Sequence, residues 1–320
     1  MPPIALSCGE PSGIGPELAQ KAWGALGASL PFFWIGDPAH LPGGCPVTLI
    51  DRPDQAIGAT GLPVLAHAMP GALTPGTPNP AHAQGVIDAI ARGVDLALSG
   101  AAGALCTAPI HKKALSDGAG FAHPGHTEYL AALTGTPRVV MMLASDQLRV
   151  VPATIHLPLR DVAQALTPDL LGDTIRITHA GLIRDFGIAA PRIAIAGLNP
   201  HAGEGGKIGR EELDLIAPVL DALRAEGLNL IGPLSADTMF HAAARAGYDA
   251  AICMYHDQAL IPIKTLDFDR GVNVTLGLPI VRTSPDHGTA LDIAGRGMAN
   301  PTSLIDALKM AARMAAARSG

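Results

Sequence analysis

Three of the 12 histidines in this 320-residue chain follow apolar runs that have the composition of central β-strands. The segments "ATIH", "GLNPH" and "CMYHD" place them at His156, His201 and His256. Because the carboxyl ends of parallel strands meet at one edge of a sheet, these side chains could converge. Imidazole nitrogens suit zinc and other divalent metals and leave positions open for a substrate. The sequence therefore predicts a metal site built from the three histidines.

A second group of side chains has the chemistry that an anionic ligand needs. Arginine and lysine bind phosphate or carboxylate oxygens through charge-assisted hydrogen bonds, and hydroxyl and amide groups add further donors. Lys264 follows "LIPI" and Arg282 follows "PIV", where an unused charge beside an apolar strand would be costly. The predicted substrate-binding residues are His126, Thr127, Lys264, Asn273 and Arg282.

Two carboxylates are candidates for a place near the metal. Asp237 in "ADTMF" is the first and Asp257 is the second. A structural role for Asp237 is equally open, because it could cap a helix that begins in "TMFHAAARAG". We predict catalytic roles for Asp237 and Lys264.

The segment "CGEPSGIGPE", Cys8 to Glu17, is a glycine-rich loop after an apolar run. Backbone N–H groups in such a loop often bind phosphate, but neither a Walker A loop nor a G-x-G-x-x-G fingerprint is present. Pro16 suits the first turn of a helix, and Glu17 complements the positive end of its dipole. The segment predicts a strand, a sharp turn and a capped helix.

Composition and patterning indicate a folded α/β protein. Hydrophobic residues make up 48% of the chain and charged residues 16%, and short apolar runs alternate with helical segments such as "AQGVIDAIARGVDLAL". This alternation predicts a mainly parallel sheet. A net charge of −6 without a basic cluster argues against nucleic acid as the main partner.

Four widely separated cysteines suggest neither a disulfide framework nor a Cys-x-x-Cys metal site, so we expect reduced thiols and a cytoplasmic location. The amino terminus lacks a basic region followed by a long apolar core, and no apolar run approaches membrane-spanning length. We therefore expect no membrane partner.

Several long motifs resemble the 4-hydroxythreonine-4-phosphate dehydrogenase family, also called PdxA. They include "GEPSGIGPE", "GHTEYLA", "GLNPHAGEGGKIG", "YHDQALIPIK" and "GVNVTLGLPIVRTSPDHGTALDIAG", so the resemblance covers nearly the whole chain. Two mild departures are Glu10, where many members have aspartate, and Ala259, where glycine is frequent.

The resemblance extends to the isocitrate and isopropylmalate dehydrogenase fold group through "GIGPE" and "DHGTALDIAGRGMANP". It implies two α/β/α domains that flank a cleft. We expect residues 1–125 with 270–320 to form the NAD-binding domain and residues 126–269 to form the domain for metal binding and dimerisation. The implied cofactor-binding residues are Gly13, Gly15, Glu17, His287, Gly288, Asp292 and Asn300. For Asp292, capping of the turn before "IAGRG" is an open alternative.

The family reaction implied for the chain is NAD-dependent oxidation of the C3 hydroxyl of 4-phosphooxy-L-threonine. The product, 2-amino-3-oxo-4-phosphooxybutanoate, then loses CO2 to give 3-amino-2-oxopropyl phosphate. A divalent metal (zinc, magnesium or cobalt) would act as the Lewis acid. The resemblance also implies a homodimer in which both subunits supply metal ligands.

Other functions use the same side chains. Related family members act on D-threonate or D-erythronate 4-phosphate or on a dihydrodiol. A metal-dependent phosphatase could use the three histidines and the cations, but it would not need the "HGTALDIAG" loop. A non-catalytic binding protein would bind its ligand without turnover.

Overall fold

The computed structural model describes residues 1–27 and 29–319. Its contacts divide the chain into two compact units, residues 1–139 with 278–320 and residues 140–277. The boundaries between the units lie after Val139 and after Gly277, whereas we expected them after residues 125 and 269. As a consequence, His126 and Thr127 belong to the first unit and Asn273 to the second. The NAD-binding and dimerisation roles of the units stay predictions.

The first unit contains a parallel sheet of short strands, most of which are apolar and buried; the exceptions are the partly exposed edge strand Val47–Ile50 and the polar strand Arg282–Pro285. Burial on both faces explains the continuous apolar runs in the sequence. Register is fixed by pairs such as Ile4 with Phe32 and Ile4 with Ala104. In spatial order the strands are β3 (Val47–Ile50), β4 (Leu62–Ala66), β2 (Phe32–Gly36), β1 (Ile4–Ser7), β5 (Ala104–Thr107) and β12 (Arg282–Pro285).

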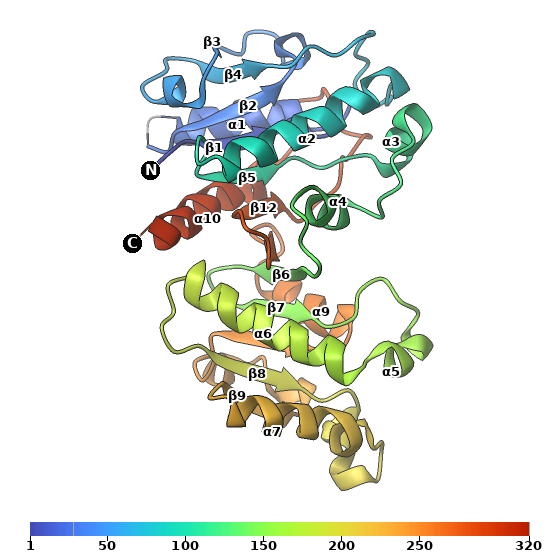
Figure 1. Ribbon diagram of the computed structural model, residues 1–320. Coiled ribbons are helices and arrows are strands. Elements are labelled where there is room, and N and C mark those ends of the chain that lie inside the picture. The colour runs from blue at the N-terminus through green and yellow to red at the C-terminus, as the bar shows by residue number, and fades with distance from the viewer. Residues whose placement is uncertain (28, 320) are drawn as a thin grey trace. The chain divides into compact units, whose positions relative to one another are not determined.

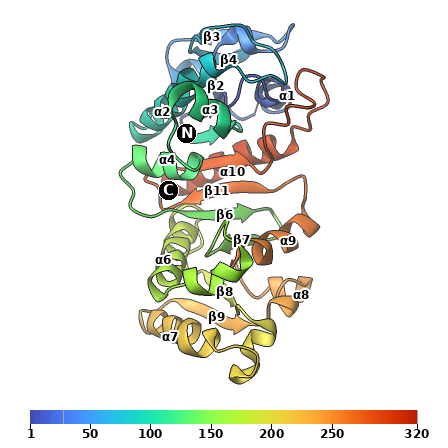
Figure 2. The same ribbon diagram turned by 90° about the vertical axis from the view of Figure 1, so that its right-hand side faces the viewer.

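Helices flank this sheet. Figure 2 shows α2 and α3 on one side of it and α1 on the other, and α10 packs against α1. Phe32, Phe33 and Trp34 are fully buried between these layers and supply much of the apolar surface that stabilises the unit. The helix bounds are α1 (Gly15–Leu26), α2 (Ala83–Leu98), α3 (Lys112–Ala119), α4 (His126–Leu133) and α10 (Thr302–Ser319), and Figure 1 labels each of them.

The second unit has a mixed sheet. Strand β6 pairs antiparallel with β7 and with β11, whereas β7, β10, β8 and β9 are parallel. The strands in spatial order are β11 (Val272–Leu276), β6 (Val140–Ala144), β7 (Arg149–Pro152), β10 (Ala250–Cys253), β8 (Arg192–Ala196) and β9 (Asn229–Leu234).

The helices of the second unit cover both faces of its sheet. Figure 2 shows α6 and α7 on one side and α8 and α9 on the other. Their bounds are α5 (Val162–Ala165), α6 (Pro168–Arg184), α7 (Ala217–Ala225), α8 (Ala242–Arg245) and α9 (His256–Leu266). No helix in the described part of the chain is long and apolar enough to cross a membrane.

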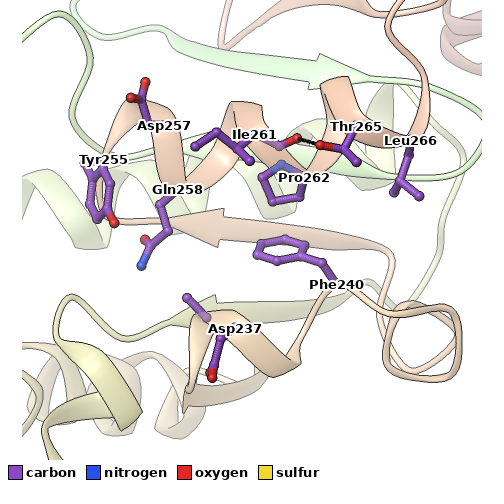
Figure 3. A pocket seen from close by; sticks show the side chains of 10 residues that line it. Asp237, Phe240, Tyr255, Asp257, Gln258, Ile261, Pro262, Thr265 and Leu266 are labelled. Carbon is purple, nitrogen blue, oxygen red and sulfur yellow. Dashed lines mark hydrogen bonds between the residues drawn. The ribbon is translucent and has the colours of Figure 1, made fainter.

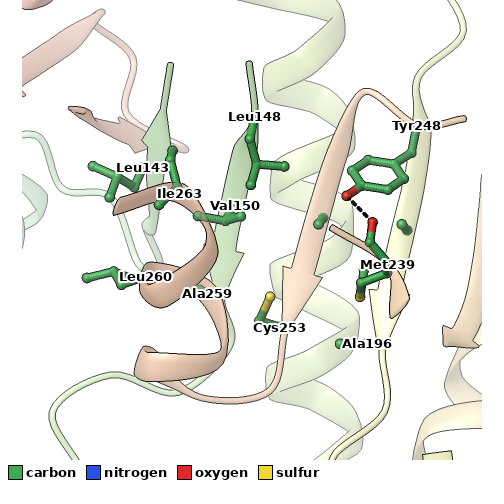
Figure 4. Packing of buried hydrophobic residues seen from close by; sticks show 12 residues of the cluster. Leu143, Leu148, Val150, Ala196, Met239, Tyr248, Cys253, Ala259, Leu260 and Ile263 are labelled. Atoms are coloured by element: carbon green, nitrogen blue, oxygen red, sulfur yellow. Dashed lines mark hydrogen bonds between the residues drawn. The ribbon is translucent and has the colours of Figure 1, made fainter. Parts of the chain in front are cut away.

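A buried cluster holds α9 on the sheet of the second unit (Figure 4). Ala259 and Ile263 from α9 pack among residues of β6, β7 and β10, such as Val150. Replacing a side chain such as Ile263 with alanine typically costs about 2–5 kcal/mol. Because α9 begins at His256, this packing also positions one of the predicted metal ligands.

The sequence did not predict strand β9 or the two antiparallel pairings of β6. Strand β9, "NLIGPL", contains a Gly-Pro pair that is unusual within a strand, so no strand was expected there. The mainly parallel arrangement is otherwise confirmed. The four cysteines are free thiols, and Cys8, Cys106 and Cys253 are buried.

Candidate active site

The glycine-rich loop from Cys8 to Glu17 packs directly on the predicted cofactor-binding segment "DHGTALDIAGRGMANP". The Ile14 backbone N–H donates to the Thr289 carbonyl oxygen at 3.0 Å. A Cβ atom on Gly13 would lie 2.8 Å from that same oxygen, which no side chain could tolerate without a shift. The loop therefore needs glycine so that two distant segments can approach each other closely.

Glu17 stabilises the contact between these two segments through hydrogen bonds. Helix α1 has Pro16 in its first turn, as expected, and Glu17 follows it. The Glu17 carboxylate accepts hydrogen bonds from the backbone N–H of Ala299 at 2.8 Å and from Lys21 Nζ at 2.7 Å. Lys21 also donates to the carbonyl oxygens of Gly297 and Ala299. Glu17, predicted to bind the cofactor, thus orders the wall of a pocket.

That pocket has a volume of about 440 Å³ and lies between the start of α1 and the loop around Gly295. Its walls are largely proline, glycine and leucine, with four polar side chains that could contact a ligand. The lining residues are Pro11, Gly13, Pro16, Glu17, Gln20, Lys21, His40, Leu41, Pro42, Gly43, Leu73, Pro75, Gly295 and Gly297.

The other predicted cofactor residues differ in what they already bind. The Asn300 side-chain oxygen accepts from the backbone N–H and the hydroxyl of Thr302, at the start of α10. His287 Nδ1 lies 3.0 Å from the Gly288 carbonyl oxygen. The Asp292 carboxylate is exposed and accepts no hydrogen bond within residues 1–27 and 29–319, which argues against the turn-capping alternative.

Arg282 opens β12 and lies beside β5 in the first unit. Only 3% of its surface is exposed, and Nη2 donates to the Thr107 hydroxyl at 2.7 Å. Burial lowers the pKa of Arg282 to about 10, so the guanidinium remains charged at neutral pH. The Glu128 carboxylate opposes this lowering, and an anionic ligand would further stabilise the buried charge.

His126 and Arg282 are brought together. His126 is the first residue of α4, and its Nε2 atom is buried without a hydrogen-bond partner in the part of the chain that the structure describes. Burial lowers the pKa of His126 well below its usual range, and the charges of Arg282 and Lys112 lower it further. Thr127 follows in the first turn, where free backbone N–H groups favour an anion.

The three predicted metal ligands follow neighbouring strands of the second unit. Strands β7, β10 and β8 are adjacent and parallel, so His156, His256 and His201 follow carboxyl ends at one edge, as expected. The imidazole rings of His156 and His256 have centroids 5.7 Å apart. No group of three His, Cys, Asp or Glu side chains suitable for a metal ion is found among the described residues. The structure therefore brings two of the three histidines together, and the three-histidine site stays a prediction.

Backbone strain marks the same segments. His156 and His201 both have φ of 52°, in the left-handed region that non-glycine residues rarely adopt. Such strain costs on the order of 1–3 kcal/mol and concentrates at functional sites. The other non-glycine residues with positive φ in the described chain also lie in the predicted site segments; they are Ala202, Glu204 and Ala290.

His256 lines one of two pockets in the second unit that share Asp257. Its Nδ1 atom lies 2.7 Å from the Asp257 carboxylate, which can fix the orientation of the ring. A pocket of about 240 Å³ is lined by His156, His256 and Asp257, among others. Asp257 also lines a larger, apolar pocket of about 450 Å³ beside α9.

Figure 3 shows this larger pocket, with Asp237 and Asp257 on different walls and Phe240 between α9 and the turn that carries Asp237. The Asp237 carboxylate is exposed and accepts from the Ser235 hydroxyl at 2.6 Å. The helix-capping alternative for Asp237 is wrong, because α8 begins at Ala242 and His241 caps it.

Lys264 and Asn273 have different surroundings. Lys264 lies in the last turn of α9, so our expectation that it follows an apolar strand is wrong. The apolar run "LIPI" lies within a helix that contains Pro262, with Leu260 and Ile263 buried and Ile261 exposed. Asn273 lies in β11 opposite Leu143, and its side-chain oxygen is buried with no hydrogen-bond partner in the described chain.

Comparison with known proteins identifies relatives across the whole chain. The model of the family described as pyridoxal phosphate biosynthetic protein PdxA matches residues 39–311. A 4-hydroxythreonine-4-phosphate dehydrogenase from Roseobacter denitrificans is 67% identical over 317 residues, which cover 98% of this chain and 97% of that protein. The crystal structure of a 4-hydroxythreonine-4-phosphate dehydrogenase from Klebsiella pneumoniae has a TM-score of 0.89 at 37% identity and covers 98% of this chain and 100% of that one.

A more distant solved structure is a terephthalate 1,2-cis-dihydrodiol dehydrogenase from Burkholderia xenovorans LB400. It has a TM-score of 0.69 at 28% identity and covers 98% of each chain. The fold and these relatives define an oxidoreductase of the α/β class, as expected. The chain belongs to the PdxA family of pyridoxal phosphate biosynthesis, which confirms the resemblance seen in the sequence motifs.

Proposed function

We propose that the chain oxidises the C3 hydroxyl of 4-phosphooxy-L-threonine with NAD+ and that the resulting 2-amino-3-oxo-4-phosphooxybutanoate loses CO2. The observation that carries this proposal is the buried, charged Arg282 beside the first residue of α4. A phosphate monoester carries a charge of about −1.5 to −2 at neutral pH and would offset the cost of burying this guanidinium. The close relative from Roseobacter denitrificans, named for a substrate of this kind, supports the same assignment.

The predicted substrate-binding residues have side chains suited to a phosphorylated substrate. In the first unit, Arg282 would donate to an anionic group, and the first turn of α4 with Thr127 would add donors. His126 would bind as a neutral imidazole, since its pKa is lowered. In the second unit, Lys264 would contribute a charge and Asn273 a side-chain amide. Asp237 stays a candidate for proton transfer, because it is exposed to the pocket beside α9.

The predicted metal ligands have the donor chemistry of a divalent-metal site. His156 and His256 lie close together, and two of the three histidines occupy strained backbone positions that need a compensating interaction. Asp257 would hold the His256 ring and set which of its nitrogens faces the metal. A zinc, magnesium or cobalt ion there would polarise the substrate oxygen and stabilise the charge left as CO2 departs.

The pocket beside α1 is our candidate cofactor site. Gly13 lines it, and Gly288 has open space where a side chain would be, so backbone could contact a dinucleotide closely. Asp292 is exposed and could accept hydrogen bonds from ribose hydroxyls. NAD+ bound there would supply the hydride acceptor.

We further propose a homodimer whose partner subunit completes the metal site. Two features of α9 and the turn after it support this: Ile261 is 63% exposed and Phe268 is 75% exposed. Ile261 lines the apolar pocket that also contains Asp237 and Asp257. Large exposed apolar side chains beside functional groups are typical of subunit interfaces. A cytoplasmic location stays a prediction.

The decisive experiment is a turnover assay with a panel of substrates. The panel contains 4-phosphooxy-L-threonine, D-threonate 4-phosphate, D-erythronate 4-phosphate and a cis-dihydrodiol, each with NAD+ and zinc, magnesium or cobalt. We expect NADH formation to be fastest with 4-phosphooxy-L-threonine. Faster turnover of another substrate would reassign the chain within its family, and phosphate release without NADH would indicate a phosphatase.

A further inference from the structure

We propose that Lys112 is a second cation of the phosphate site and positions the phosphorylated substrate together with Arg282. The proposal rests on the proposed function and deepens it. Sequence reasoning did not select Lys112, because "HKK" after β5 looks like an ordinary exposed helix start. The tertiary structure changes this interpretation.

Lys112 lies against the start of α4. A Cβ atom placed on Gly125, the residue before this helix, would lie 3.5 Å from both Cε and Nζ of Lys112. The ammonium group is thus next to the residue that precedes His126 and Thr127. Its charge is also one of the causes that lower the pKa of His126, alongside Arg282. Lys112 and Arg282 therefore act on the same imidazole.

The path of the chain keeps Lys112 in this place. Arg282 donates to Thr107 at the end of β5, and Lys112 begins α3 shortly after that strand. His111 caps α3, since its Nδ1 atom accepts from the backbone N–H of Ala114 at 3.1 Å. The cap and the Arg282 contact fix both ends of the connection between strand and helix.

The electrostatics of this arrangement favour an anionic ligand. A lysine in the first turn of a helix is placed against the positive end of the helix dipole, which is unfavourable by itself. Here the charges of Lys112 and of the buried Arg282 both act on His126, which is the first residue of α4. Glu128 reaches the same place, with Oε2 3.4 Å from the Cβ position on Gly125, and its charge raises the pKa of Arg282, but it forms no ion pair with Lys112 in the described chain. A dianionic phosphate would compensate this excess of positive charge.

The neighbouring Lys113 provides a matched control. It is also exposed and lies in the first turn of α3, but its Nζ forms an ion pair with Asp117 at 2.6 Å. The charges that lower the pKa of His126 are those of Arg282 and Lys112. The two lysines are adjacent, chemically identical and differ in what their charges face.

The test compares Lys112→Met, Lys112→Arg and Lys113→Met in the full-length enzyme. Binding of inorganic phosphate is measured by calorimetry without turnover, and kcat and KM are measured with 4-phosphooxy-L-threonine. We expect Lys112→Met to weaken phosphate binding and raise KM about tenfold, in the range for a charge-assisted contact, with a much smaller change in kcat. Lys112→Arg should retain most of the affinity, and Lys113→Met should behave as the native enzyme.

A second readout is the pKa of His126, followed by NMR. Lys112→Met should raise this pKa, because a nearby positive charge is removed, whereas Lys113→Met should leave it unchanged. Equal effects of Lys112→Met and Lys113→Met on phosphate binding would overturn the proposal. If the native enzyme binds phosphate through Lys112 but does not oxidise 4-phosphooxy-L-threonine, the proposed substrate is wrong and the role of Lys112 stands.

Discussion

The Glu17 carboxylate accepts a hydrogen bond of 2.8 Å from the backbone N–H of Ala299, a residue 282 positions further along the chain. Lys21 completes the link, since it pairs with Glu17 and donates to the Ala299 carbonyl oxygen. The first helix and the loop before the last helix are thus joined by a buried carboxylate.

We expect Glu17→Ala to lower the free energy of unfolding by about 1–3 kcal/mol, because the Ala299 N–H and Lys21 lose their acceptor. The binding of NAD+ should also weaken, since the loop forms one wall of the candidate cofactor pocket. Chemical denaturation and calorimetry measure the two effects. Glu226→Ala is the control, because Glu226 forms an exposed ion pair with Arg176 and its removal should cost less than about 1 kcal/mol. Equal losses in both variants would contradict the linking role of Glu17.

Metal retention tests the three strand-end histidines. His156→Ala and His201→Ala should each abolish turnover and reduce the bound zinc after dialysis, while the circular dichroism spectrum remains native. His179→Ala, in the middle of α6, serves as a control that should retain both metal and activity. Full activity in a variant shown to be metal-free would exclude the metal mechanism.

If Arg282 binds the substrate phosphate, its replacement should lower kcat/KM more for a phosphorylated substrate than for an unphosphorylated one. Arg282→Ala should lower kcat/KM at least tenfold with the phosphorylated substrate, in line with a charge-assisted contact of about 1.5–3 kcal/mol. For an unphosphorylated analogue, kcat/KM should fall much less. Because Arg282 is buried, thermal unfolding must show that the variant is folded, and Arg282→Lys offers a milder change that keeps the charge. Similar losses with both substrates would mean that Arg282 does not bind the phosphate.

Cofactor choice depends on Asp292. A carboxylate that accepts from the adenosine ribose would repel the additional phosphate of NADP+, so we expect NAD+ to be preferred. Arg296 is nearby in the chain and should keep this preference from being absolute. The ratio of kcat/KM for the two cofactors should shift toward NADP+ in Asp292→Lys. An unchanged ratio would show that this loop does not bind the ribose.

The buried His40 should make the folded protein less stable in acid. Burial lowers the pKa of His40, and the neighbouring His82, whose ring centroid lies 4.9 Å away, lowers it further, while Asp37 opposes both. Below the usual histidine pKa of about 6.5, the unfolded chain binds a proton that the folded chain does not. The stability is therefore fully present above about pH 6.5 and falls as the pH drops toward the lowered value.

We expect His40→Gln to unfold with a weaker pH dependence than the native protein between neutral and mildly acidic pH. Denaturation midpoints at several pH values measure this, and His67→Gln, at a half-exposed position, is the control. An identical pH dependence in the native protein and in His40→Gln would rule out the buried imidazole as the cause.

Much of the fold could be predicted from local sequence. Apolar runs such as "FFWIG" and "AAIC" are strands because they are buried on both faces, and Pro16 with Glu17 begins a helix because of local backbone and dipole effects. The sequence also predicted that His156, His201 and His256 each follow a strand, and these three strands are neighbours in the sheet. These features depend on residues close together in the chain.

Other features were decided by contacts between distant residues. "LIPIK" has the composition of a strand, yet packing of Ala259 and Ile263 makes it part of α9, and this changes the surroundings of Lys264. The antiparallel direction of β6 depends on its pairing with β7 and β11. Lys113 has Asp117 four residues further on, so its ion pair could be predicted from the sequence. The surroundings of Lys112 could not be predicted in this way, because they depend on the return of the chain that brings Gly125 beside it, and electrostatic energy depends on distance in space rather than along the chain.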